Sequence, residues 1–205
     1  MDIQNAPVVT HHLRMTEEEF VAWCDEDTKA EWVDGEVIMP SPANLQHVNL
    51  AGFLLIVVRL FTTQRGLGVV YGPELQIQLG ALRRRRVPDL LFISTERMSI
   101  VEATEIDGAP DLIVEIVSPD SPARDWREKY LEYEAAGVRE YWVVDPMSQC
   151  LEGYTVGADG RYALIAEKDG VVYSTVLAGF FLNPAWLWQE PLPNPLAILR
   201  DLGVL

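Results

Sequence analysis

The chain has 205 residues, of which 49% are hydrophobic and 23% are charged, and its formal net charge is −15. This composition is ordinary for a soluble globular protein, and the length fits one domain with a sizeable core. A protein whose main task is to hold DNA by its backbone is usually basic, because phosphate contacts supply most of the non-specific affinity. The acidic charge therefore argues against tight, general DNA binding.

The sequence predicts a cytoplasmic protein without a membrane segment. Its longest apolar stretch, residues 50–61, is interrupted by Arg59 and is shorter than the roughly 20 residues that span a bilayer. The N-terminus lacks the Lys- or Arg-led apolar region of a secretory signal. The two cysteines, Cys24 and Cys150, form neither a metal-binding spacing nor a disulfide framework.

The N-terminal part predicts a lead-in, a helix and a hairpin. Residues 1–15 show no periodicity and are expected to be extended. Thr16 and Glu19 match a capping box, which predicts the start of a short helix. Residues 30–39 contain Asp34-Gly35, a dipeptide typical of the turn between two hairpin strands.

The remainder predicts alternating helices and strands and then a β-rich region. Helical spacing of apolar residues favours a helix over residues 43–65. Buried strands are expected over residues 69–79, 87–93, 111–118 and 140–145, with a helix over residues 125–136 closed by Gly137. A meander with strands over residues 150–156, 161–167 and 171–177 follows, and a short helix ends the chain. We expect one α/β (α+β) domain over residues 1–205, with a β-rich C-terminal extension over residues 148–190.

Glu115 is the most unusual residue, because it stands among apolar residues in a segment that is expected to be a buried strand. Side chains alternate between the two faces of a strand, so Glu115 shares its face with Ile113 and Val117. An unpartnered carboxylate there would cost several kcal/mol, so a cation, a metal or strong donors must meet it. The alternative is a salt bridge within the core.

A second acid, Asp89, follows Pro88 at the start of another apolar run, 26 residues before Glu115. Two strands that each bring one carboxylate inward indicate a metal site more readily than a core. The alternative for Asp89 is a residue that caps the backbone at the start of its strand.

Four consecutive arginines precede the Asp89 strand and are a local exception to the acidic charge. We interpret them either as a solvated turn between strands or as a rim beside the acidic pair that contacts the phosphates of nucleic acid. The four residues are Arg83, Arg84, Arg85 and Arg86.

Lysine is rare, with 3 lysines against 13 arginines, and Lys129 lies in the helix that is expected after the Glu115 strand. On a helix, Asp125, Lys129 and Tyr133 are four residues apart and share one face. Lysine is a compact donor whose pKa can be moved, whereas arginine is always charged. Lys129 is therefore a candidate to act on a water or a scissile phosphate, and the alternative is an exposed ion pair with Asp125.

Taken in order, these segments resemble the Uma-type endonuclease family of the PD-(D/E)XK (restriction-endonuclease-like) superfamily, from about Thr16 to the end of the meander. The resemblance is carried by DGEVIMPSP at 34–42 with His47, VPDL at 87–90, PDLIVEIVSP at 110–119, AGVREYW at 136–142 and VDP at 144–146, together with Asp125, Lys129 and Tyr133.

The resemblance implies a mixed β-sheet flanked by helices and a divalent metal held by Asp89, Glu115 and the backbone carbonyl of Ile116. The superfamily pattern places a lysine two residues after the acid, where this chain has Val117. In the Uma group the lysine comes from the following helix, which implies Lys129 here.

Four residues receive supporting roles by the same resemblance or by their positions. Glu36 matches an outer metal ligand, although it is equally well an exposed hairpin acid. His47 supports the site from the first turn of the long helix, unless it is only a partly buried helix residue. Asp125 would orient Lys129, and Tyr133 would pack or hydrogen-bond beside it.

The implied activity is metal-dependent hydrolysis of phosphodiester bonds, most readily of DNA, in which Lys129 assists the attacking water or the transition state. The oxygen ligands suit Mg²⁺ or Mn²⁺. Nucleic acid is the expected substrate, and a homodimer is expected because cutting both strands of a duplex needs two sites. The alternatives are a non-catalytic binding or assembly module that keeps the nuclease fold, and a hydrolase of a smaller phosphate-containing substrate.

Overall fold

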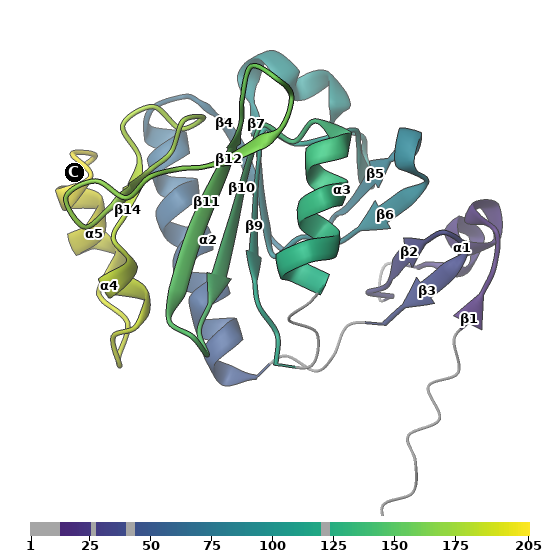
Figure 1. Cartoon of the computed structure of the whole chain (residues 1–205), viewed down its shortest axis with the longest axis horizontal. Helices are drawn as coiled ribbons and strands as arrows, with labels where there is room; N and C mark the ends of the chain where they lie inside the picture. Colours follow the sequence, from purple (N-terminus) through teal and green to yellow (C-terminus); the bar gives the residue numbers. More distant parts are fainter. Residues whose placement is uncertain (1–12, 26–27, 40–43, 120–123) are drawn as a thin grey trace, which may run out of the picture.

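The computed structural model describes residues 13–25, 28–39, 44–119 and 124–205. Two six-stranded sheets form its framework, and each mixes parallel and antiparallel neighbours (Figure 1). The main sheet has the order β12-β11-β10-β9-β7-β4, and the N-terminal sheet has the order β1-β3-β2-β6-β5-β8. The expected α/β class is confirmed, but twelve of the described strands divide between these two sheets where one main sheet was expected.

The main sheet contains the strands that carry the central acids. Its one parallel pair is β9–β10, and the crossover that such a pair requires holds the helix with Lys129. All other neighbours pair antiparallel. The strands are β4 (Gly68–Tyr71), β7 (Leu90–Ser94), β9 (Leu112–Ile116), β10 (Glu140–Asp145), β11 (Cys150–Val156) and β12 (Tyr162–Leu164).

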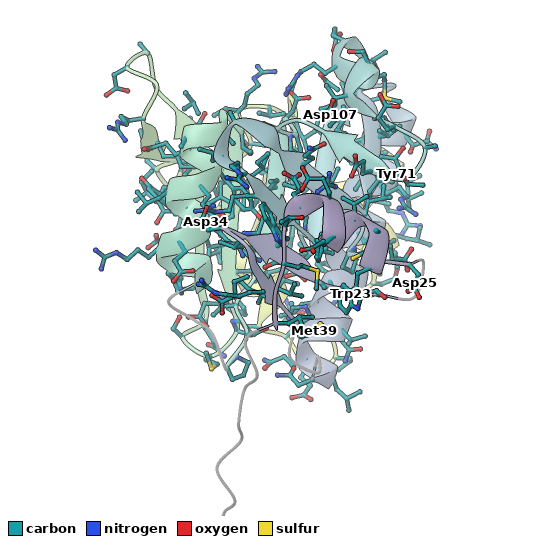
Figure 2. The ribbon with its side chains drawn as sticks, turned by 90° about the vertical axis from the view of Figure 1, so that its right-hand side faces the viewer. Trp23, Asp25, Asp34, Met39, Tyr71 and Asp107 are labelled. Atoms are coloured by element: carbon teal, nitrogen blue, oxygen red, sulfur yellow. The ribbon has the colours of Figure 1, made fainter. Side chains whose placement is uncertain are left out.

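The N-terminal sheet is built from short strands. They are β1 (Leu13–Arg14), β2 (Glu31–Val33), β3 (Glu36–Ile38), β5 (Gln76–Leu79), β6 (Arg84–Arg86) and β8 (Glu105–Asp107). The β2–β3 hairpin turns at Asp34-Gly35, where both residues have positive φ, 49° and 86°, as the predicted tight turn requires. Figure 2 looks onto this hairpin, with Asp34 at its turn and Met39 at the opposite end.

Two expected strands differ in the structure: one is divided and the other begins later than predicted. The run 69–79 forms β4 and β5, which belong to different sheets. The run 87–93 begins only at Leu90 as β7, while the arginines before it form β6. In the C-terminal part β11 matches the expected strand, whereas β13 (Val172–Tyr173) and β14 (Phe181–Leu182) form a separate two-stranded sheet.

The predicted helices begin and end close to the predicted positions, and one short helix, α4, lies in the segment that was expected to be β-rich. Thr16 caps α1 (Glu17–Trp23) through the predicted reciprocal bonds with Glu19. Gly137 ends α3 (Lys129–Ala136) in the left-handed conformation, and a π-helical turn, Arg124–Glu128, precedes that helix. The others are α2 (Leu45–Gln64), α4 (Pro184–Leu187) and α5 (Pro195–Asp201).

The two faces of the main sheet pack against different layers. Leu112, Val114 and Ile116 of β9 pack in one core with α2 and the C-terminal segments. Ile113 and Val117 face a second core with α3 and the N-terminal sheet (Figure 1). The predicted alternation along this strand is therefore confirmed, and Glu115 points toward the second core. By length and composition alone α2 could also cross a membrane; here its buried side packs on the main sheet.

A buried carboxylate, Asp111, fixes the start of β9. Asp111 is fully buried, and it accepts hydrogen bonds from the Ser94 amide at 2.8 Å and from Arg97 and Arg139 at 3.1 Å each. Burial alone would raise the pKa of Asp111, but the Ser94 and Arg97 hydrogen bonds lower it below its ordinary value.

Because this pKa is lower in the folded state, the stabilisation by Asp111 is present above about pH 4 and is lost as the pH falls further. We expect Asp111→Asn to lower the free energy of unfolding at pH 7 by about 2 kcal/mol. The difference from wild type should shrink below pH 4 in urea unfolding series. A difference that stays constant with pH would contradict this role.

Candidate active site

Glu115 meets two donors from one helix. The Lys129 Nζ atom lies 2.9 Å from Glu115 Oε2, and the Tyr133 hydroxyl donates to Glu115 Oε1 at 2.7 Å. All three side chains are buried. The carboxylate that the sequence left without a partner therefore has a cation and a hydrogen-bond donor, which removes most of the cost of burying it.

The position of Lys129 follows from how α3 lies against the main sheet. Lys129 begins α3, and Tyr133 follows one turn later on the same face. The alternative of an exposed Lys129 is wrong, because only 6% of the residue is exposed. The side chain of Asp125 lies outside the described structure, so its orienting role stays a prediction.

Asp89 lies directly before β7, next to the strand that carries Glu115. Its Oδ2 atom accepts the backbone N–H of Ile116 at 2.7 Å, and its Oδ1 atom lies 3.1 Å from His47 Nε2. His47 stands in the first turn of α2, which Asn44 caps. The structure thus brings Asp89 and His47 together. Ile116 contacts Asp89 through its N–H, so ligation of a metal by its carbonyl stays a prediction.

A further acid, Glu31, reaches the same place from the N-terminal sheet. Its Oε1 atom lies 3.7 Å from Lys129 Nζ and accepts the Val87 N–H at 3.2 Å. Its Oε2 atom accepts from Arg86 at 2.7 Å. Glu31 was not among the predicted site residues, although a signal like that of Glu115 was present: it stands between Ala30 and Trp32 in a short apolar segment.

The electrostatics keep these groups in defined protonation states. Burial favours a neutral Glu31, but Lys129 and Arg86 lower its pKa overall, so it is ionised at neutral pH. Burial, with the charges of Glu115 and Glu31, raises the pKa of Tyr133 well above its usual range. The phenol therefore stays protonated and remains a donor to Glu115.

Three of the four arginines form salt bridges with acidic residues of the protein itself. Arg85 and Arg86 are 5% and 0% exposed, so neither a solvated turn nor an exposed rim describes them. Their partners lie within the protein: Arg85 binds Glu17 and Glu105, Arg86 binds Glu31 and Glu132, and Arg84 binds Asp34 and Glu132. Arg83 is exposed and lies over the Trp32 ring. Periodicity could not reveal this, because the partners are up to 68 residues away.

Glu36 lies on β3, half-buried, opposite Val33 of β2. It shares a face of the hairpin with Glu31, which is the hairpin acid beside Lys129. In the described part of the chain no three His, Cys, Asp or Glu side chains are grouped so that they could hold a metal ion. The role of Glu36 as an outer metal ligand therefore stays a prediction.

Asp89 and Glu115 nevertheless suit a hard divalent cation. Mg²⁺ often binds through only one or two carboxylates and keeps several of its waters. Each carboxylate oxygen has a second lone pair beyond the hydrogen bond it already accepts. The donor set therefore fits a water-rich Mg²⁺ or Mn²⁺ site better than zinc, which prefers nitrogen and sulfur ligands.

The arrangement of sheets and helices is shared with a solved crystal structure described as "a putative nuclease belonging to DUF820" from Anabaena variabilis ATCC 29413. The TM-score is 0.70 at 21% sequence identity, and the match covers 85% of this chain and 97% of the other. At this identity the likeness establishes the fold alone. No curated protein matches the chain.

The sequence model of the Uma2 family, described as "Putative restriction endonuclease", matches residues 17–185. Because the match covers well over half of the chain, the protein belongs to the Uma2 family. Glu31, His47, Asp89, Glu115 and Lys129 all lie within the matched region.

Proposed function

We propose that this protein is a metal-dependent endonuclease that hydrolyses phosphodiester bonds, with DNA as its first candidate substrate. The observation that carries the proposal is the contact of Lys129 with Glu115. Glu115 lies on β9, whose Ile116 N–H binds Asp89, and the chain belongs to the Uma2 family. The lysine comes from α3, and the position two residues after Glu115 is occupied by the core residue Val117. The set of two acids and a lysine is therefore made by Asp89, Glu115 and Lys129, with the lysine on a helix and not on the strand.

Each residue has a role that its contacts support. Asp89 and Glu115 would hold Mg²⁺ or Mn²⁺, which when bound lowers the pKa of a water and offsets charge on the phosphoryl oxygens. Lys129 would donate a hydrogen bond to the attacking water or to a phosphoryl oxygen, where negative charge develops. His47 orients Asp89, and Tyr133 orients Glu115. Positioning partners of this kind affect activity even though they do not react.

The test is nicking of supercoiled plasmid by the wild-type protein with Mg²⁺, with Mn²⁺ and with chelator. The control is an Asp89→Asn/Glu115→Gln double variant purified in parallel, so that a contaminating nuclease appears in both preparations. Nicking that needs the cation and is lost in the double variant supports the proposal. Cation binding without hydrolysis of duplex DNA, single-stranded DNA or RNA would favour the non-catalytic module.

Nucleic acid binding and assembly follow from the proposal as separate expectations. With a net charge of −15 and three of the four arginines bound internally, affinity for DNA without the cation should be weak. A homodimer would provide one site for each strand of a duplex, and sedimentation of the purified protein measures it directly.

A further inference from the structure

The Lys129 ammonium group lies between two carboxylates that come from different sheets. Its distances are 2.9 Å to Glu115 on β9 and 3.7 Å to Glu31 on β2. The three side chains are 7%, 3% and 10% exposed, in the order Lys129, Glu115, Glu31. A buried ammonium group therefore has a near partner and a second anion just beyond hydrogen-bond distance.

Glu31 is held in place independently of Lys129. Both of its oxygens accept hydrogen bonds from the segment before Asp89, one from Arg86 and one from the Val87 N–H. Arg86 is in turn fixed by Glu132 at 2.9 and 2.8 Å. The Glu31 carboxylate is thus a fixed negative charge whose position depends on β6 and α3.

The two acids around Lys129 have different duties under the proposed function. When Glu115 engages a cation, its charge is shared and its attraction for Lys129 weakens. A buried charge that loses its partner is strongly unfavourable, so Lys129 would move away from the site unless another anion were near. Glu31 supplies that anion, and the Glu115 carboxylate stays available to the cation.

We propose, on the basis of the proposed function, that Glu31 is a positioning residue that keeps the Lys129 ammonium group at the site while Glu115 holds the cation. Glu31 also ties the N-terminal sheet to the site, because its hydrogen bonds fix the chain two and three residues before Asp89. It acts through Lys129 and does not touch the substrate.

The test uses the small number of lysines, Lys29, Lys129 and Lys168. In protein with ¹⁵N-labelled lysine, a buried and paired ammonium group exchanges slowly with water and gives an Nζ signal, which Lys129→Arg assigns. Glu115→Gln neutralises the nearer acid and imitates its engagement without any cation. We expect the Lys129 signal to persist in Glu115→Gln and to disappear in Glu115→Gln/Glu31→Gln.

The matched control is Glu115→Gln/Glu128→Gln, which removes an equal charge from an exposed side chain next to Lys129 in the sequence. This control should keep the Lys129 signal. Loss of the signal in Glu115→Gln alone, or equal loss with Glu128→Gln, would overturn the positioning role. Urea unfolding of each variant confirms that the protein is folded, and Glu31→Met, which also removes the charge, replaces Glu31→Gln should the latter not fold.

A second measurement links the residue to turnover. Glu31→Gln should reduce the nicking rate by about 10- to 100-fold, as loss of an orienting partner does, while Mn²⁺ affinity is unchanged. Weaker Mn²⁺ binding in this variant would instead place Glu31 in the cation site and overturn the inference. The NMR test needs neither cation nor substrate, so an inactive wild type would refute the nuclease proposal without deciding this one.

Discussion

Lys129→Ala is expected to reduce nicking of supercoiled plasmid by about 10²- to 10³-fold, the loss that follows removal of one donor to transition-state charge. Affinity for Mn²⁺ should be kept or increased, because Lys129 competes with the cation for Glu115. The measurements are initial nicking rates at saturating Mn²⁺ and calorimetric titration of Mn²⁺. The two results together separate a catalytic loss from a lost metal site.

Lys168→Ala is the control for Lys129→Ala, because Lys168 is exposed and its substitution removes the same charge. It should nick like the wild type. Nicking that is unchanged in Lys129→Ala would show that the lysine only neutralises Glu115 within the core.

Glu115→Ala is expected to lower the free energy of unfolding by about 3 kcal/mol, because Lys129 loses its nearer partner and keeps only Glu31, at 3.7 Å. The side chains of Glu115 and Lys129 are 3% and 7% exposed, so water cannot replace the lost partner readily. Replacing both residues with leucine should restore most of this loss, since apolar residues of similar volume often substitute for a buried pair at little cost. Urea unfolding at neutral pH measures all three proteins.

Comparing the stability and the activity of these proteins distinguishes a catalytic role of the Glu115–Lys129 pair from a structural one. A Glu115→Leu/Lys129→Leu protein that is as stable as the wild type but inactive would show that the pair serves chemistry and not folding. A Glu115→Ala protein within about 1 kcal/mol of the wild type would contradict its burial as a coupled pair.

Much of the site was predictable because its residues violate local patterns. Glu115 is an acid among five apolar strand residues, and the period of two gave its face correctly. Lys129 was indicated by the rarity of lysine and by its helical spacing from Tyr133. Both signals depend only on neighbours in the chain, which a sequence displays directly.

The division into two sheets was not predictable by the same means. Five strands of the N-terminal sheet have only two or three residues, too few for an alternation to be read. The arginine run was also misread, since burial of Arg86 depends on Glu31 and Glu132, 55 and 46 residues away. Charge pairing across the fold overrides the expectation that consecutive arginines are solvated.

Glu31 was missed for a related reason. Its strand has only three residues, and the family resemblance indicates Glu36, the other acid of the hairpin. The structure shows that the two acids share a face and that Glu31 lies beside Lys129. An acid next to buried aromatic residues, even in a short segment, is therefore a useful sequence signal.

The most direct test of the central claim is calorimetric titration of Mn²⁺ into wild type, Asp89→Asn and Glu115→Gln, with plasmid nicking measured on the same preparations. Both substitutions keep the side-chain volume, so a folded protein is expected in each case. If Asp89 and Glu115 form a metal-dependent nuclease centre, the wild type binds Mn²⁺ and nicks, and both variants lose binding and nicking together. Equal Mn²⁺ affinity in the three proteins would contradict it and would leave Glu115 as the buried partner of Lys129.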